Sequence, residues 1–193
     1  MSEELEAALK QQFDAADFDG TMTAAIEGYG GELYGFLVGL AHDRALADDV
    51  FGSACERLWK ALPKFRWDST FRVWAYTIAR NEFLRSTRET NRAKQRVPIS
   101  QVASIQQAID RARTSTPLHQ RTDVKDRFAK VREELEPDDH MLLGLRLDRQ
   151  MGWTDIARVL GSGDEAAVTR EAATLRKRYE RLKDRLRELV ADD

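Results

Sequence analysis

The stretch from Lys64 to Asn81 constrains the fold of this chain more than any other. Pro63 stands directly before it and predicts the end of a preceding helix, because a proline ring cannot continue one. Residues 68–70 are all of types that cap helix N-termini. A helix that runs on to about Arg88 is predicted from the apolar residues that follow at helical spacing. Its expected buried stripe consists of Phe71, Trp74, Ala75, Ile78 and Ala79.

The loop before this helix combines aromatic and basic side chains, with Phe65 and Trp67 among them. Such a loop on a rigid helix suits single-stranded nucleic acid, because bases stack on rings and phosphates pair with cations. The same two rings would also serve as core side chains that cover a helix end. The residues alone leave both interpretations open.

Charge is distributed unevenly along the 193 residues, although the formal net charge is only −2. The first 20 residues carry six acidic side chains and one lysine, and they predict either a short helix or a solvated terminus. Basic residues gather at 80–96 and again at 170–187. This asymmetry is typical of a protein that contacts nucleic-acid phosphates at two places.

Several classes of protein are excluded by what the sequence lacks. The three histidines are dispersed, and no phosphate-binding glycine loop or metal-ligand spacing occurs, so we expect no enzyme, metal, cofactor or small-molecule substrate. Cys55 lies on an apolar helical stripe and is expected to be a core residue. The lone cysteine fits a reducing cytoplasm, and no apolar run or signal peptide predicts membrane insertion.

Helical periodicity predicts an all-α fold of two small domains joined by a linker. A helix is expected near 22–41, and Asp48 and Asp49 are expected to open the next one, where acids favour the positive end of the helix dipole. The pattern weakens over 91–125, with one short amphipathic helix around Val102–Ile109. The expected segments are an acidic 1–20, a first domain at 21–90, a linker at 91–125 and a second domain at 126–190.

The second domain shows a short apolar stripe after Gly152, a glycine-bearing turn at 161–165 and a long helix. This order predicts a helix-turn-helix, although an ordinary helical hairpin with a basic surface would read the same way. One face of the long helix carries small, hydroxyl and basic side chains that suit a DNA major groove. Its expected DNA-contacting residues are Ala166, Thr169, Arg170, Ala173, Thr174, Lys177, Arg178 and Arg181.

Taken together, both blocks resemble a bacterial RNA polymerase sigma factor of the extracytoplasmic-function (ECF) group. The resemblance rests on Ala47–Phe51, on Trp59–Arg66 and above all on Ser69–Asn81 in the first domain. In the second domain it rests on Leu145–Leu147, on Gly152–Gly161 and on the helix from Val168. The middle domain of larger sigma factors has no counterpart here.

The resemblance implies that the first domain binds core RNA polymerase and opens the promoter −10 element, and that the second reads the −35 element. Polymerase would be bound by the helix that carries Asp48, Asp49, Gly52, Ser53 and Glu56. The family usually has glutamine and an acid where this chain has Gly52 and Ser53. The −10 contacts would come from Lys64, Phe65, Arg66, Trp67, Asp68, Ser69, Thr70, Arg72, Arg80, Asn81 and Arg85.

Two other functions are compatible with the sequence. A stand-alone helix-turn-helix regulator would bind duplex DNA without polymerase, and a helical adaptor would use both blocks for protein contacts. Sigma factors of this group commonly have an anti-sigma partner, and the sequence leaves open whether this chain has one.

Overall fold

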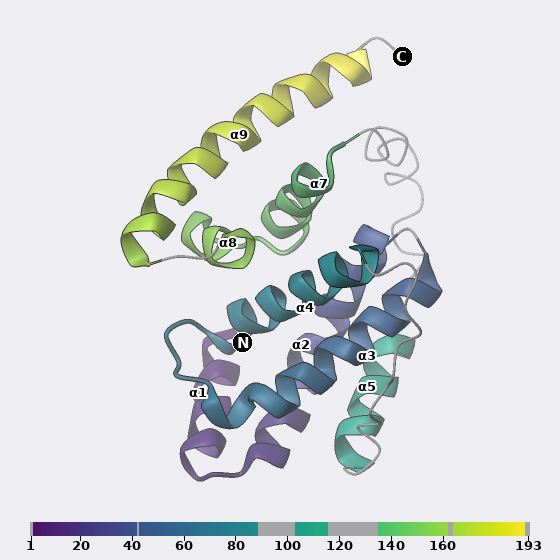
Figure 1. Cartoon of the computed structure of the whole chain (residues 1–193), viewed down its shortest axis with the longest axis vertical. Helices are drawn as coiled ribbons and strands as arrows, with labels where there is room; N and C mark the ends of the chain where they lie inside the picture. Colours follow the sequence, from purple (N-terminus) through teal and green to yellow (C-terminus); the bar gives the residue numbers. More distant parts are fainter. Residues whose placement is uncertain (1, 42, 89–102, 116–134, 162–163, 192–193) are drawn as a thin grey trace. The chain divides into compact units, whose positions relative to one another are not determined.

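The computed structural model describes residues 2–41, 43–88, 103–115, 135–161 and 164–191 (Figure 1). These residues form helices and connecting turns and contain no strand, so the all-α prediction is confirmed. The chain divides into two compact units, Met1–Thr116 and Pro117–Asp193. Each unit is described by itself.

The first unit is built around α2. Its elements are α1 (Ser2–Asp14), α2 (Phe18–Ala41), α3 (Arg44–Ala61), the 3-10 turn η1 (Leu62–Lys64), α4 (Phe71–Arg88) and α5 (Ala103–Ser115). The α2 helix packs against each of the four other α-helices, and so most of the core gathers on it. Fully buried side chains at this centre include Met22, Tyr34, Leu37, Phe51, Leu58 and Tyr76.

The α3 helix begins earlier than predicted. Asp43 is its N-cap, and the Asp43 carboxylate accepts a hydrogen bond from the Ala45 N–H at 3.0 Å. The expectation that Asp48 and Asp49 open this helix is therefore wrong, because an Asx cap five residues upstream starts it. Both acids lie in the second turn, on the side of the helix rather than at its end.

The α4 helix begins where the sequence predicts, and Thr70 accepts a hydrogen bond from the Val73 N–H at 3.2 Å. Its buried face is wider than the predicted stripe, because α4 packs against both α2 and α3. Trp74 and Ile78 are only half-buried, whereas Tyr76 is fully buried. The buried residues of α4 are Phe71, Val73, Ala75, Tyr76, Ala79, Glu82 and Phe83.

The acidic N-terminal segment is not a solvated lead-in. It forms α1, which packs against α2 and α4 and buries Leu9 completely. The Glu6 carboxylate accepts hydrogen bonds from the N–H groups of Phe71 and Arg72, at 2.8 and 3.0 Å. It also accepts one from the Tyr29 hydroxyl at 2.8 Å. A negative charge thus meets the positive end of α4 and pairs two N–H groups that have no partner within the helix.

The segment expected to be a linker contains α5, which packs against α2 and α3 and belongs to the first unit. Its buried face holds Ile105, Ala108, Ile109 and Ala112. Amphipathic spacing around residues 102–109 did predict a short helix, and Val102 lies outside the described residues. The packing on α2 was not predicted.

The second unit contains α7 (Pro137–Leu143), the single π-helical turn η2 (Gly144–Asp148), α8 (Trp153–Leu160) and α9 (Glu165–Ala191). The α8 and α9 helices pack against each other, and α7 packs against α9. Asp164 caps α9 by accepting a hydrogen bond from the Ala167 N–H at 2.8 Å. The apolar residues between these helices include Met141, Leu142, Leu145, Ile156, Val159 and Leu175.

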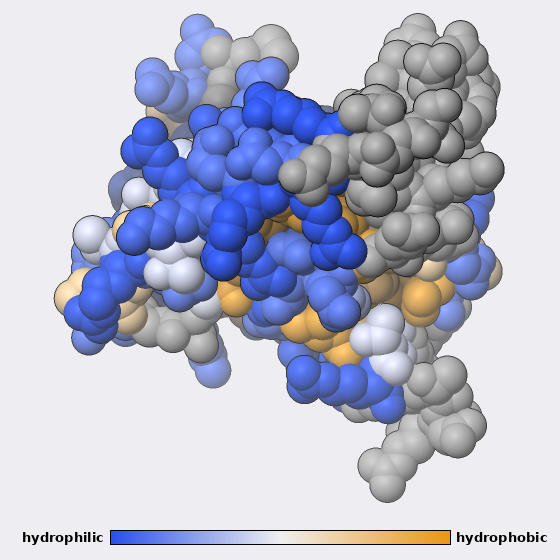
Figure 2. Space-filling model, turned by 90° about the horizontal axis from the view of Figure 1, so that it is seen from above, coloured by the Kyte–Doolittle hydropathy of each residue, from blue (hydrophilic) through white to orange (hydrophobic). Residues whose placement is uncertain are grey.

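The described surface is largely polar. Figure 2 shows one face of the molecule, on which hydrophilic residues predominate among those that are coloured. This polar surface is consistent with the sequence, in which charged residues make up 33%. Among the described residues, no helix combines the length and apolar character needed to cross a membrane.

Removing the Glu6 carboxylate is expected to destabilise the first unit. Glu6→Ala leaves two α4 N–H groups and the Tyr29 hydroxyl without this acceptor, so the free energy of unfolding should fall by about 1–3 kcal/mol. Urea unfolding would be followed by tryptophan fluorescence in a Trp153→Phe background, where the three remaining tryptophans all report on the first unit. The exposed Glu3 is the matched control on α1. Equal unfolding curves for Glu6→Ala and Glu3→Ala would contradict the capping role.

Candidate nucleic-acid interface

The loop between η1 and α4 carries an aromatic cluster, which we define as Phe13, Phe65, Trp67, Phe71 and Trp74. The Phe65 ring stacks on Trp74, with centroids 4.4 Å apart and planes 15° from parallel. Trp67 lies against Phe65 at 4.9 Å on one side and against Phe13 of α1 at 5.7 Å on the other. Phe65 and Trp67 are half-buried, so each ring supports the fold and keeps part of its surface open.

Trp67 is held in an unfavourable conformation. Its φ of 59° lies in the left-handed region, which a bulky side chain rarely adopts. Its indole Nε1 is buried and has no hydrogen-bond partner within the described part of the chain. Backbone strain of this kind costs of the order of 1–3 kcal/mol and collects at binding sites. Trp67 is therefore the strongest functional candidate in the loop.

The polar residues of the loop surround this cluster. Lys64, Arg66, Asp68 and Thr70 are exposed, and Ser69 is half-buried. Arg66 pairs with Asp68 at 2.8 Å, but the two side chains are 83% and 70% exposed. Such a pair contributes little to stability. Lys10 of α1 adds a cation 5.6 Å from the centroid of the Trp67 ring.

Arg72, predicted to contact DNA, is engaged within the fold. Its Nε and Nη2 donate to the two carboxylate oxygens of Glu32, at 2.6 and 2.8 Å. The two side chains are 21% and 24% exposed. The hydrogen bonds to Glu32 raise the pKa of Arg72 above its ordinary value. This bidentate pair joins α4 to α2.

The other predicted −10 residues on α4 lie further along the helix. Asn81 and Arg85 are exposed and Arg80 is half-buried. Arg88 ends the helix and is also exposed. The basic residues Arg92, Lys94 and Arg96 lie outside the described residues.

The residues expected to bind polymerase lie on one side of α3. Asp48, Asp49, Gly52, Ser53 and Glu56 are all half-buried, and their three- and four-residue spacing places them on one helix face. The Asp48 carboxylate accepts a hydrogen bond from the Tyr34 hydroxyl at 2.8 Å. Burial and this hydrogen bond raise the pKa of Tyr34 above its ordinary value.

Cys55, also on α3, is a core residue as predicted. The side chain is 1% exposed, and desolvation raises the pKa of the thiol to about 12. A thiol with this pKa is protonated at neutral pH and is a poor nucleophile. No group of three or more histidine, cysteine or acidic side chains among the described residues is arranged to hold a metal ion.

In the second unit, α9 presents most of its predicted DNA-facing residues to solvent. Arg178 is the exception, since its guanidinium donates to the Asp139 carboxylate of α7 at 2.5 Å and is only half exposed. The contact with Asp139 gives Arg178 a role in holding α7 against α9. The exposed residues are Ala166, Thr169, Arg170, Ala173, Thr174, Lys177 and Arg181.

The contribution of α1 to the site was not predicted from the sequence. Glu6, Lys10 and Phe13 lie at helical spacing on one side of α1, where they cap α4 and contact Trp67. The apolar spacing of Leu5, Leu9 and Phe13 was a signal for a packed helix. Its partner could not be read from the sequence, because α4 begins more than 50 residues later.

Comparison with known protein families finds a match within the first unit. Residues 25–93 match the family model of Sigma-70 region 2. Over these residues the first unit is similar to sigma-70 region 2. The match runs from α2 through α3, the aromatic loop and α4, and it ends before α5 and the second unit. No curated protein matches the chain.

The region 2 match supports a sigma-70 family member with a role in transcription initiation. Proteins of this family bind core RNA polymerase and promoter DNA and are not enzymes. The aromatic loop and the α3 residues that the resemblance predicts to bind polymerase both lie inside the matched segment.

Two arginines near the loop should behave differently when removed. Arg72→Ala leaves the half-buried Glu32 without its partner and should lower the free energy of unfolding of region 2 by about 1–3 kcal/mol. Arg66→Ala removes an exposed arginine and should change it by no more than about 0.5 kcal/mol. The same urea assay in the Trp153→Phe background measures both. A coupling energy near zero in the cycle with Glu32→Ala would contradict the bridging role of Arg72.

Proposed function

We propose that this chain is a sigma factor of the ECF type, which binds core RNA polymerase, opens the promoter −10 element and reads the −35 element. The observation that carries the proposal is the strained, half-buried Trp67 in the loop of a sigma-70 region 2. Such a factor acts in the cytoplasm, where core polymerase transcribes DNA. Run-off transcription with core polymerase and a promoter library tests the proposal as a whole.

The aromatic cluster provides an energetic reason for duplex opening. Unstacking DNA costs about 1–2 kcal/mol for each base step. A base that stacks on a protein ring recovers about 1–3 kcal/mol. A flipped base therefore finds in Trp67 a ring that Phe65 and Phe13 already hold in place. Little entropy is lost on binding, because the ring is ordered beforehand.

Polar side chains around the cluster would complete the −10 site. Ser69, Thr70 and Asn81 have groups that can donate to or accept from a base edge. Lys64, Arg66, Arg80 and Arg85 would hold phosphates of the opened strand. We assign Arg72 to the support of the loop, since its donors already bind Glu32. Asp68 would release Arg66 when a phosphate arrives.

The α3 face is the proposed polymerase surface. Asp48, Asp49 and Glu56 offer carboxylates to a basic partner, and Ser53 offers a hydroxyl. Gly52 contributes only backbone at this place, where the ECF resemblance predicts a glutamine. An acidic face matched to a basic partner surface would speed association and set its orientation.

The second unit would read duplex DNA with α9. Its start is preorganised by the Asp164 cap and by Arg158, which pairs with Glu165 at 2.7 Å. The exposed Arg170 and Thr169 lie near the N-terminal end of the helix, the part that enters the major groove in a helix-turn-helix. An arginine there can bind a guanine edge with two hydrogen bonds.

Trp67→Ala should reduce promoter melting. Loss of about 1–3 kcal/mol of stacking corresponds to a fall of roughly 5- to 150-fold in the open-complex equilibrium. Permanganate reactivity of thymines in the −10 region, measured per folded molecule, reports this fall. Trp67→Phe should retain most of the melting, because a ring remains. Trp59→Ala on α3, outside the loop, is the control. Unchanged reactivity for Trp67→Ala would assign Trp67 to the core alone.

Arg170 and Lys177 of α9 should contribute differently to base selectivity. Arg170→Ala should relax selection at one −35 position at a cost of about 1–3 kcal/mol, whereas Lys177→Ala should weaken binding to all sequences about equally. Binding-site selection with each variant, performed at one fixed salt concentration, separates these effects. If both variants lose affinity uniformly, Arg170 contacts phosphate and does not read a base.

A further inference from the structure

The polymerase-facing side of α3 is partly covered by another segment of the same chain. The α5 helix packs against α2 and α3 through its buried face, which consists of Ile105, Ala108, Ile109 and Ala112. This helix lies outside the region 2 match. An isolated 13-residue helix is marginal in water, so α5 depends on this packing for its own structure.

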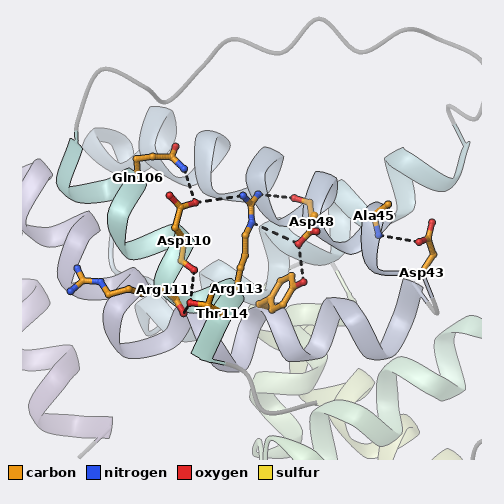
Figure 3. Close-up of polar contacts among 9 residues, drawn as sticks. Asp43, Ala45, Asp48, Gln106, Asp110, Arg111, Arg113 and Thr114 are labelled. Atoms are coloured by element: carbon orange, nitrogen blue, oxygen red, sulfur yellow. Dashed lines mark hydrogen bonds and ion pairs between the residues drawn. The ribbon is translucent and has the colours of Figure 1, made fainter. Parts of the chain in front are cut away.

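Arg113, in the last turn of α5, contacts α3 directly (Figure 3). Its Nη2 donates to the Asp48 carbonyl oxygen at 2.9 Å, and its Nε lies 3.9 Å from the Asp48 carboxylate. The guanidinium also lies 5.9 Å from the centroid of the Phe51 ring. Asp110 flanks it from α5 itself at 3.9 Å. The Arg113 side chain is only 29% exposed as a result.

Gly52 allows this approach. A Cβ at position 52 would lie 3.1 Å from Arg113 Nη2, closer than an ordinary van der Waals contact. On α2, a Cβ at Gly30 would lie 2.9 Å from the Ala112 Cβ. A glycine inside a helix costs about 1 kcal/mol relative to alanine. Both glycines therefore have a structural role, because they let α5 pack closely against α2 and α3.

Two further contacts hold the rest of α5 along α2. The Thr23 hydroxyl donates to the Ser104 hydroxyl at 3.2 Å, at the first turn of α5. Arg111 pairs with Glu27 at 2.6 Å in an exposed position. Contacts with α2 and α3 therefore hold α5 from Ser104 to Arg113.

We propose that α5 is an intramolecular strap that occupies the polymerase-binding face of α3 and must leave it before core polymerase binds. The inference rests on the proposed function. It follows from the contacts of Arg113. Asp48 and the surface beside Gly52 cannot contact α5 and polymerase at the same time. Gly52, where a sigma factor of this group would carry glutamine, is the place that the strap occupies.

A reversible disulfide tests the strap in a single protein. Thr23→Cys together with Ser104→Cys replaces two hydroxyls in contact by thiols, which can approach to the disulfide length with small side-chain shifts. The oxidised form keeps α5 tethered at its seat. We expect it to bind core polymerase at least tenfold more weakly than the same protein after reduction. Wild type and the Thr23→Cys single variant, treated alike, are the controls.

Release of the strap provides the opposite test. Arg113→Ala removes the contacts with Asp48 and keeps helix propensity, so it should bind core polymerase several-fold more tightly than wild type. Arg111→Ala, which removes only the exposed pair with Glu27, is the matched control and should bind like wild type. Hydrogen exchange of the α5 amides should increase in Arg113→Ala alone.

The outcomes separate the strap from the proposed function. Equal polymerase affinity of the oxidised and reduced forms would overturn the strap and leave a polymerase-binding sigma factor with a purely structural α5. If wild type, the reduced form and Arg113→Ala all fail to bind core polymerase, the proposed function is wrong and the strap is overturned with it.

Discussion

The start of α4 is the point on which the candidate interface depends. Thr70 and Glu6 together pair three N–H groups of the first turn, and the Glu6 carboxylate places a full negative charge at the positive end of the helix. The position of this first turn of α4 fixes the end of the loop that precedes it. Phe65 can then stack on Trp74, and Trp67 is held in a left-handed conformation that a free chain would leave. The ring contacts of Trp67 with Phe65 and Phe13 also oppose this strain.

Arginines around the interface divide into two groups by their partners. Arg72 and Arg113 bind acceptors within the fold, Glu32 and Asp48, and both are less than a third exposed. Arg66 is mostly exposed, and its pairing with Asp68 is weak in water. The same residue type thus joins helices in one place and offers charge to a phosphate in another. Burial and acceptor geometry decide which, since a partly buried bidentate pair is costly to break.

Much of the fold could be predicted from local patterns. The helix from Phe71 to Arg88, the presence of a capping residue within 68–70 and the apolar face around Cys55 follow from spacing and side-chain type, which act over a few residues. One prediction failed for a local reason, because Asp43 and not Asp48 is the N-cap of α3. The other failures occurred where a partner lies far along the chain. The segment that contains α5 was interpreted as a linker because its hydrogen-bond partners on α2 and α3 lie 65 to 84 positions earlier.

The sequence by itself determined that the chain is helical, that the segment before Phe71 carries aromatic and basic side chains, and that Gly52 departs from the pattern of the family that the chain resembles. Helical periodicity and side-chain type are local features, and so they can be read from the order of residues. Only the tertiary structure decided that Glu6 caps α4, that Arg72 belongs to Glu32, and that Arg113 fills the space beside Gly52. These contacts arise from the packing of helices on α2, which brings together residues 40 to 66 positions apart.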